Sequence, residues 1–169
     1  MSAGRPTRKC RNSVGVVAGP HQLTPKVASD QNLPMNGSDR ESPTVWPTVR
    51  CDDARALIDF LVAAFGFEEQ FTVPGEGGKG IIHAQIRWSS GGGVMLGDAW
   101  IGDADHLPLP SGPTSIYVVT DQPDALHNQA LAAGATIVRG LRDEDYGSRG
   151  FSATDPEGNF WSFGTYGGE

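Results

Sequence analysis

Few residues in this chain of 169 amino acids carry the side chains that catalysis or ligand clamping requires. His83 stands in an alternating run with Gln85 on the same side, so it could contact a ligand or act as a general base. Arg149 closes the sequence Tyr146-Gly-Ser-Arg149 and could clamp a carboxylate or phosphate. Both residues also have a structural interpretation, because a single strand histidine is often solvated and three acids precede Arg149, namely Asp143, Glu144 and Asp145.

Three other patterns predict no chemistry. The run GEGGKG at 75–80 resembles a phosphate loop but lacks the following helix and the Lys-Ser/Thr pair. Ser148 and Ser152 have no His and acid arranged for nucleophilic catalysis. A metal site built from His83, His106 and an acid would need two histidines at unrelated positions to converge, and their spacing gives it little support.

The elements that must position these residues come as a repeated unit. Asp53 and Asp121 stand 68 residues apart, and each begins an apolar helical stripe that reaches a glycine thirteen residues later, Gly66 or Gly134. A strand-like run precedes each copy. A strand–helix unit that occurs twice in so short a chain predicts a duplicated domain.

Each half has the predicted order β-α-β-β-β. In the first half we expect a strand at 45–51, a helix ending at Gly66, and strands at 67–73, 81–88 and 94–97. In the second we expect a strand at 114–120, a helix at 122–133, strands at 135–140, 148–154 and 159–164, and a loop at 141–147. The fold class is α+β, with tandem modules at 44–98 and 113–166 whose curved mixed sheets surround a cleft.

Periodicity also predicts which side chains are buried. In the first helix the buried stripe consists of Ala56, Leu57, Phe60, Leu61 and Ala64. Along 81–88, alternation places Ile82, Ala84, Ile86 and Trp88 on one face of the strand. Trp88 is then expected in the core or at a dimer contact, whereas Trp100, in the linker at 98–112, is the better candidate for stacking on a ligand.

Charge and composition restrict the partners. Residues 1–34 carry five basic residues and one acid, a net of +4, and the rest carries 8 basic and 19 acidic residues, a net of −11. An acidic body disfavours nucleic acid and is compatible with cationic ligands. Two cysteines form no disulfide framework and no apolar run is long enough for a membrane helix, so we expect a cytoplasmic protein without membrane or nucleic-acid partners.

The N-terminal segment lacks any period. Residues 1–43 are rich in Gly, Pro, Ser, Asn and basic residues, which is typical of a disordered tail. Met35 is an alternative start, so whether residues 1–34 belong to the native protein stays open.

The order of elements and three motifs resemble a known superfamily. The motifs are DARALIDF from Asp53 with Phe65-Gly-Phe67, then Ala133-Gly-Ala135, and finally DPEGNFW from Asp155. They resemble the vicinal oxygen chelate superfamily, in particular its glyoxalase/bleomycin-resistance-like subgroup, over residues 45–166. The resemblance implies the paired-module fold already described and a homodimer.

Metal enzymes of this superfamily bind their ion through His and Glu at four strand positions. Counting from the motifs places these positions at Trp46, Thr114, Ser162 and either Leu96 or Gly97. None of these residues offers an imidazole or a carboxylate, so we expect no metal and no other cofactor. Trp161 points to the face opposite Ser162, so only one of the two can line the cleft.

The resemblance together with the missing ligands predicts a metal-free protein that sequesters an aromatic or cationic organic molecule. The expected ligand-binding residues are Trp46, His83, Trp100, Thr114, Tyr146, Arg149 and Ser162, and no residue is assigned a catalytic role. The alternative is a lyase, isomerase or dioxygenase-like enzyme with a displaced metal site or with acid–base chemistry by His83 and Tyr146. A third possibility is an interaction module whose cleft is filled by Trp46 and Trp161.

Overall fold

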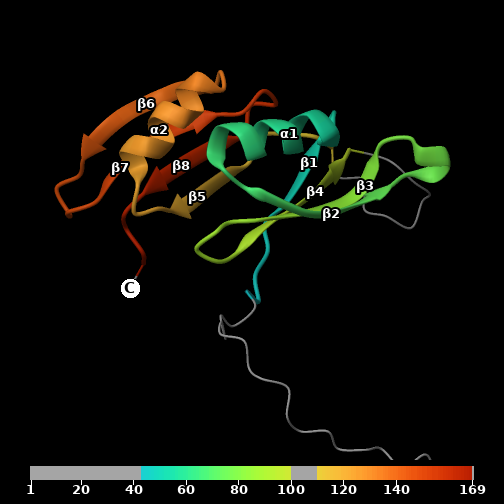
Figure 1. Cartoon of the computed structure of the whole chain (residues 1–169), viewed down its shortest axis with the longest axis horizontal. Helices are drawn as coiled ribbons and strands as arrows, with labels where there is room; N and C mark the ends of the chain where they lie inside the picture. The colour runs from blue at the N-terminus through green and yellow to red at the C-terminus, as the bar shows by residue number, and fades with distance from the viewer. Residues whose placement is uncertain (1–42, 100–109, 169) are drawn as a thin grey trace, which may run out of the picture. The chain divides into compact units, whose positions relative to one another are not determined.

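Two modules of the same order make up the described chain. The computed structural model describes residues 43–99 and 110–168, so the expected tail, Trp100 and His106 lie outside it. The first module comprises β1 (Thr48–Cys51), α1 (Ala54–Phe65), β2 (Glu68–Pro74), a 3-10 turn (Glu76–Gly78), β3 (Ile81–Arg87) and β4 (Gly93–Asp98). The second comprises β5 (Ser115–Val119), α2 (Pro123–Ala132), β6 (Thr136–Asp143), β7 (Arg149–Thr154) and β8 (Phe160–Gly164). The predicted βαβββ repeat is therefore confirmed (Figure 1).

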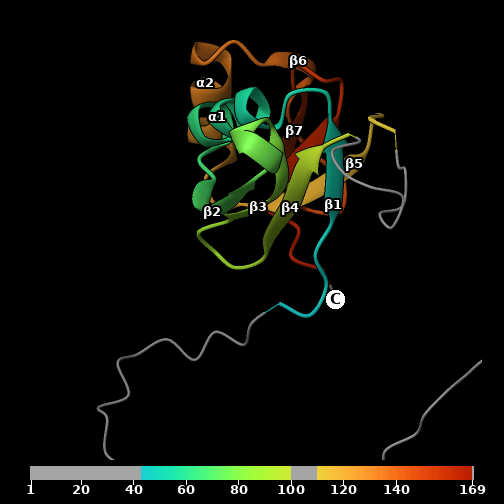
Figure 2. The same ribbon diagram turned by 90° about the vertical axis from the view of Figure 1, so that its right-hand side faces the viewer.

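Each module folds its strands into one four-stranded mixed sheet. The strand order is β1-β4-β3-β2 in the first sheet and β5-β8-β7-β6 in the second, and Figure 2 shows the first order side by side. The first strand of each module runs parallel to the last, and the other pairs are antiparallel. Because α1 and α2 cover one face of the sheets, we call the opposite face of each sheet its open face (Figure 1).

Helix α1 begins and ends where the sequence predicts. The Asp53 carboxylate accepts a hydrogen bond from the Ala56 amide at 3.0 Å, and Gly66 ends the helix with φ 76°, which favours glycine. The buried stripe differs in part from the prediction, because Ala56 is exposed and Ile58 is buried. Neither α1 nor α2, the helices of the described chain, is long and apolar enough to cross a membrane.

The core runs without interruption through both modules. Phe65, at the end of α1, lies 5.7 Å from Trp161 and 4.7 Å from Phe163 of β8, measured between ring centroids. Phe67 lies 5.2 Å from Trp88 and 5.5 Å from Trp161. Aromatic rings at these separations stabilise each other beyond simple burial. The modules therefore depend on each other for their core, and Trp88 is half-buried and packs against that core, in line with the first of its two expected roles.

A buried turn ties the second module to the first. Asp155 accepts hydrogen bonds from the Glu157 and Asn159 amides at 3.0 and 2.9 Å, and also from the Asn159 side chain and the Trp161 indole at 2.8 and 2.9 Å. The neighbouring Glu157 carboxylate accepts from the amides of Asp52 and Asp53, just before α1. The predicted DPEG turn is thus confirmed and also joins the two modules.

Three strand predictions were wrong in detail. Strand β1 starts at Thr48, since Pro47 before it has no N–H for the ladder. At the start of β3, Ile81 is buried and Ile82 is 39 % exposed, because a register shift at Val73 and Pro74 reverses the alternation there. Strand β6 continues through 141–143, part of the expected loop.

Candidate functional site

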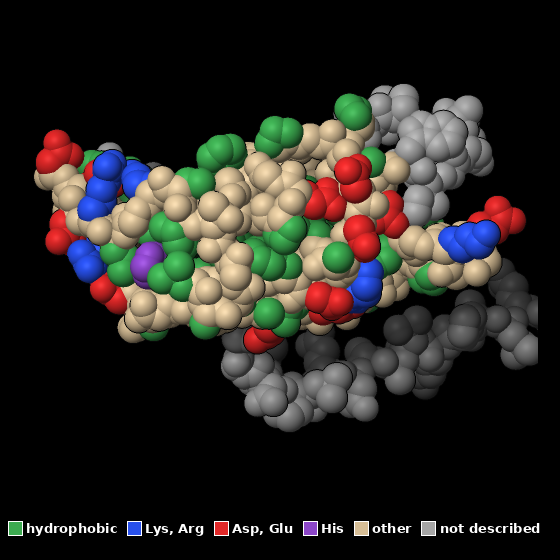
Figure 3. Space-filling view, turned by 90° about the horizontal axis from the view of Figure 1, so that it is seen from above, with side chains coloured by type: hydrophobic (Ala, Val, Ile, Leu, Met, Phe, Trp, Pro, Cys, Tyr) green, Lys and Arg blue, Asp and Glu red, His purple; other side chains and the backbone are tan. Residues whose placement is uncertain are grey.

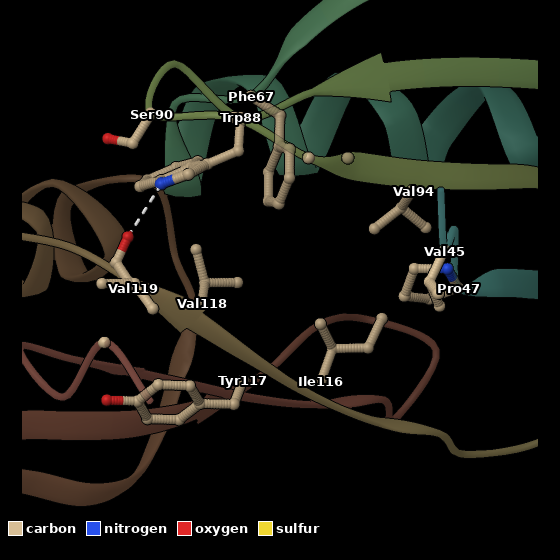
Figure 4. A pocket seen from close by; sticks show the side chains of 14 residues that line it. Val45, Pro47, Phe67, Trp88, Ser90, Val94, Ile116, Tyr117, Val118 and Val119 are labelled. Atoms are coloured by element: carbon tan, nitrogen blue, oxygen red, sulfur yellow. Dashed lines mark hydrogen bonds between the residues drawn. The ribbon is translucent and has the colours of Figure 1, made fainter. Parts of the chain in front are cut away.

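A pocket of about 460 Å³ lies at the seam between the modules. Figure 4 shows Phe67 and Trp88 on one wall, Ile116 and Val118 of β5 on the other, and Val94 at one end. Val45, Pro47 and the glycine turn of 91–93 complete the lining, along with Ser90, Tyr117, Val119 and Gly167. We call this cavity the seam pocket.

One hydrogen bond crosses the seam beside this pocket. The indole N–H of Trp88 donates to the carbonyl oxygen of Val119 at 2.8 Å, so the ring is fixed against β5 (Figure 4). Gly93 forms part of the floor, and no larger residue fits there. A Cβ on Gly93 would lie 2.2 Å from the Ile86 carbonyl oxygen and 2.6 Å from the Trp46 ring.

Of the seven residues expected to bind a ligand, the six that the structure describes do not line the seam pocket. Trp46 lies next to the lining, because Val45 and Pro47 on either side of it do line the pocket. The Trp46 indole packs on Gly93 instead, and its N–H donates to the Pro43 carbonyl at 2.9 Å. Trp100 lies outside the described residues.

His83 and Ser162 belong to the open faces of different sheets. His83, on β3, is half-buried with its ring 5.6 Å from Phe71. Ser162, on β8, shares a hydrogen bond with Ser152 at 2.9 Å between the hydroxyl oxygens. Trp161 beside it is fully buried on the helix side, so the predicted opposition of the two side chains is confirmed.

The superfamily's metal-ligand position that the sequence places at Thr114 falls one residue later, at Ser115. Thr114 precedes β5 and is held by its amide, which donates to the Asn159 side chain at 3.0 Å. Alternation along β5 gives the buried side to Val118, so Ser115 and Tyr117 share the open face with Ser162.

Tyr146 and Arg149 lie at the end of the second sheet. Tyr146 is 65 % exposed and packs edge-on against Tyr166, with ring centroids 5.9 Å apart. Arg149 binds both oxygens of Asp124 at 2.8 Å and also Asp143 at 3.1 Å. The guanidinium holds the pKa of Asp124 below its ordinary value. Of the three nearby acids, only Asp143 pairs with Arg149, and Asp124 is a partner that the sequence did not indicate.

The residues at the superfamily's metal positions do not fit a divalent ion. Leu96 is buried on the helix side, and the counterpart of Ser162 is Met95, because Met95 pairs with Gln85 as Ser162 pairs with Ser152. Trp46, Met95, Ser115 and Ser162 offer neither carboxylate nor imidazole. Within residues 43–99 and 110–168, no three His, Cys, Asp or Glu side chains converge to hold a metal.

Sequence reasoning missed the walls of the seam pocket. Phe67, Ile116 and Val118 are apolar strand residues, and such residues are typical of a core. Nothing local in the sequence distinguishes a wall that packs from one that leaves a gap, because the gap depends on how two modules meet.

Two βαβββ modules that share a core and leave a pocket at their seam are thus the frame of the candidate site. The profile of the Glyoxalase/Bleomycin resistance protein/Dioxygenase superfamily matches residues 44–163. The chain belongs to this superfamily.

Related sequences and structures agree with this assignment. The chain is 39 % identical over 127 residues to "Uncharacterized protein Mb0911c" of Mycobacterium bovis, covering 72 % of this chain and 82 % of that one. Among solved structures it is similar to TioX from Micromonospora sp. ML1, with a TM-score of 0.60, 27 % identity, and coverage of 71 % and 97 % of the two chains. Lactoylglutathione lyase from Agrobacterium tumefaciens has the same fold, with a TM-score of 0.54, 19 % identity, and coverage of 72 % and 93 %.

Proposed function

We propose that this protein binds and sequesters a small aromatic molecule in the seam pocket without metal chemistry. The observation that carries the proposal is the pocket of about 460 Å³ between Phe67 and Trp88 on one side and β5 on the other. This volume lies in the range of roughly 300–1,000 Å³ that suits a small organic ligand. A flat ligand would stack on the indole or insert between it and the apolar residues of β5.

The polar groups around the pocket are few and neutral. Ser90, the Tyr117 hydroxyl and the backbone of the glycine turn are the polar groups of the lining, beside the Val119 carbonyl that the Trp88 indole already occupies. They could orient a ligand by one or two hydrogen bonds. The expectation of an aromatic ligand thus has support from the lining, whereas the expectation of a cationic one depends on the net charge alone.

Sequestration is favoured over catalysis for this chain. The superfamily name includes bleomycin resistance proteins and dioxygenases, and one structural relative is a lyase. The enzymatic alternative relied on His83 and Tyr146. His83 on β3 packs against Phe71, whereas Tyr146 lies in the turn between β6 and β7 and packs against Tyr166, so no contact among the described residues supports a joint role.

Filling the pocket tests the proposal. Ile116→Phe would add bulk to the wall, and Val138→Phe, on β6 and 49 % exposed, is the matched control. With indole and 2-naphthol as probes, amide NMR shifts should centre on β5 and Trp88 in the wild type and in Val138→Phe. Ile116→Phe should weaken binding by at least about tenfold, which is about 1.4 kcal/mol. Unchanged affinity in the filled variant would rule out the seam pocket.

We also propose that two copies of the chain form a homodimer. Strands β1 and β5 each pair on one side only, and no described element covers the two open faces. Unpaired edges and apolar side chains such as Phe160, which is 47 % exposed, favour association with another surface. Light scattering after size exclusion should give a mass near 36 kDa, twice the 17.9 kDa of one chain. A mass of one chain at micromolar concentration would contradict the dimer.

A further inference from the structure

Six arginines lie in the described chain, and they divide into two groups. Four of them form ion pairs with carboxylates at 2.6–3.1 Å, namely Arg55, Arg139, Arg142 and Arg149. The other two, Arg50 and Arg87, make no ion pair or side-chain hydrogen bond in the parts of the chain that the structure describes. Both are half-buried, and both belong to the open face of the first sheet.

Strand register shows where these two cations stand. Arg50 of β1 lies beside Gly97 of β4, and continuing the β3–β4 register brings His83 to the other side of Gly97. Because Gly97 has no side chain, the Arg50 guanidinium lies over it, with Nη1 2.9 Å from where a Cβ would be. Arg87 pairs with Gly93, four residues away along β4.

Side chains suited to an organic body surround these cations. Met95 and Gln85 pair with each other between the two arginines, and Phe71 pairs with Gln85 on the outer strand. Phe71 is 46 % exposed, so its ring is available for contact. The acid on this face is Glu68, which stands opposite Arg87 on β2 and forms no ion pair with it.

A cation without a counter-ion on this body is unexpected on electrostatic grounds. Outside residues 1–34 the chain carries a net charge of −11, so carboxylates are plentiful. A half-buried guanidinium is stabilised by a bound anion, and it recognises carboxylate or phosphate with two parallel hydrogen bonds. The second sheet has no guanidinium at the position that corresponds to Arg50. Val119 occupies that position and pairs with Gly164.

We propose that the open face of the first sheet binds a small organic anion, a carboxylate or phosphate group attached to an apolar body. Arg50 holds the anionic group above Gly97 with His83 beside it, and Met95 and Phe71 contact the apolar part. Arg87 lies about 13 Å along the strand from this point, at about 3.3 Å per residue. It would therefore meet a second acidic group of a longer ligand. This site is separate from the seam pocket.

Three probes at equal ionic strength test this proposal on the full chain. Benzoate and inorganic phosphate are the two anionic probes, and benzylamine is a cation of similar size to benzoate. Amide NMR titration should show saturable shifts for benzoate at His83, Gln85 and Gly97, with weaker or no shifts there for benzylamine. Saturable binding of phosphate alone would also support the anion site and would assign it to phosphate.

Variants then assign the binding to the arginine. Arg50→Gln should weaken benzoate binding by at least about tenfold, whereas Arg142→Gln, which removes an exposed and paired arginine on β6, should leave it unchanged. A thermal melt of each variant checks folding, and Arg50→Lys serves if Arg50→Gln does not fold. Equal shifts for benzoate and benzylamine, or unchanged affinity in the Arg50 variant, would overturn the proposal. Failure of indole and 2-naphthol in the seam pocket would leave these results unaffected.

Discussion

Replacing Asp155 by alanine should remove a large fraction of the protein's stability. The carboxylate is 5 % exposed and accepts four hydrogen bonds within 3.0 Å. Two of the donors are side chains with almost no exposure, the Trp161 indole and the Asn159 amide. Alanine provides no acceptor, and the buried turn leaves no evident route for water to replace it.

The expected loss follows from these unsatisfied donors. A buried donor without a partner costs about 1–3 kcal/mol, so the two side-chain donors together cost about 4 kcal/mol. That is a large part of the roughly 5–15 kcal/mol that stabilises a typical domain. Asp155→Asn keeps one acceptor oxygen but turns an N–H group toward a donor, so it should lose about half as much.

Urea unfolding followed by tryptophan fluorescence and circular dichroism measures both losses. Asp145→Ala is the matched control, because Asp145 is exposed and makes no side-chain hydrogen bond or ion pair within the described ranges. Its effect should stay within about 0.5 kcal/mol. A loss below about 1 kcal/mol for Asp155→Ala, with the slope of the transition unchanged, would refute the reasoning that this turn is held by its carboxylate.

Three further predictions concern the seam, the cysteine and the exposed ion pair. Trp88→Phe removes the hydrogen bond to Val119 and should cost about 1 kcal/mol in the same urea assay. Burial raises the pKa of Cys51 from 9.0 to about 12, so iodoacetamide at pH 8 should label this thiol only after unfolding. The stability that the protonated thiol contributes is fully present below pH 9 and is lost as the pH rises toward 12. Arg149→Gln should raise the pKa of Asp124, measured by carboxyl NMR titration. The stability from this pair is present above the unfolded-state pKa of Asp124 and is lost as the pH falls through its lowered folded-state pKa.

Local signals in the sequence were enough for most of the fold. The cap at Asp53, the glycine at 66 and the turn at Asp155 each follow from one residue type at a required backbone position. Period-two alternation likewise separates Trp161 from Ser162. These features depend on neighbours within a few residues, so a sequence contains them directly.

The positions of site residues were harder, because the repeat is not strictly periodic. The helices repeat at 68 residues, but Val49 of β1 corresponds to Val118, at 69 residues, and Leu96 of β4 corresponds to Phe163, at 67. A displacement of one residue moves a strand position to the other face, which is why Ser115 and Met95 replace Thr114 and Leu96. The one-residue differences in spacing arise in the loops, and nothing in a loop's sequence shows where the next strand must begin.

The two halves differ most where packing does not constrain them. Leu96 and Phe163 are both buried under helices, so the helix side is apolar in both modules. On the open faces the corresponding positions differ: the first module has Arg50 where the second has Val119, and Met95 where the second has Ser162. A buried position changes only at a cost in packing, whereas an exposed one can change its chemistry freely. Two open faces that differ in charge are suited to different parts of a ligand or to different partners, and the proposed anion site uses the charge of the first face.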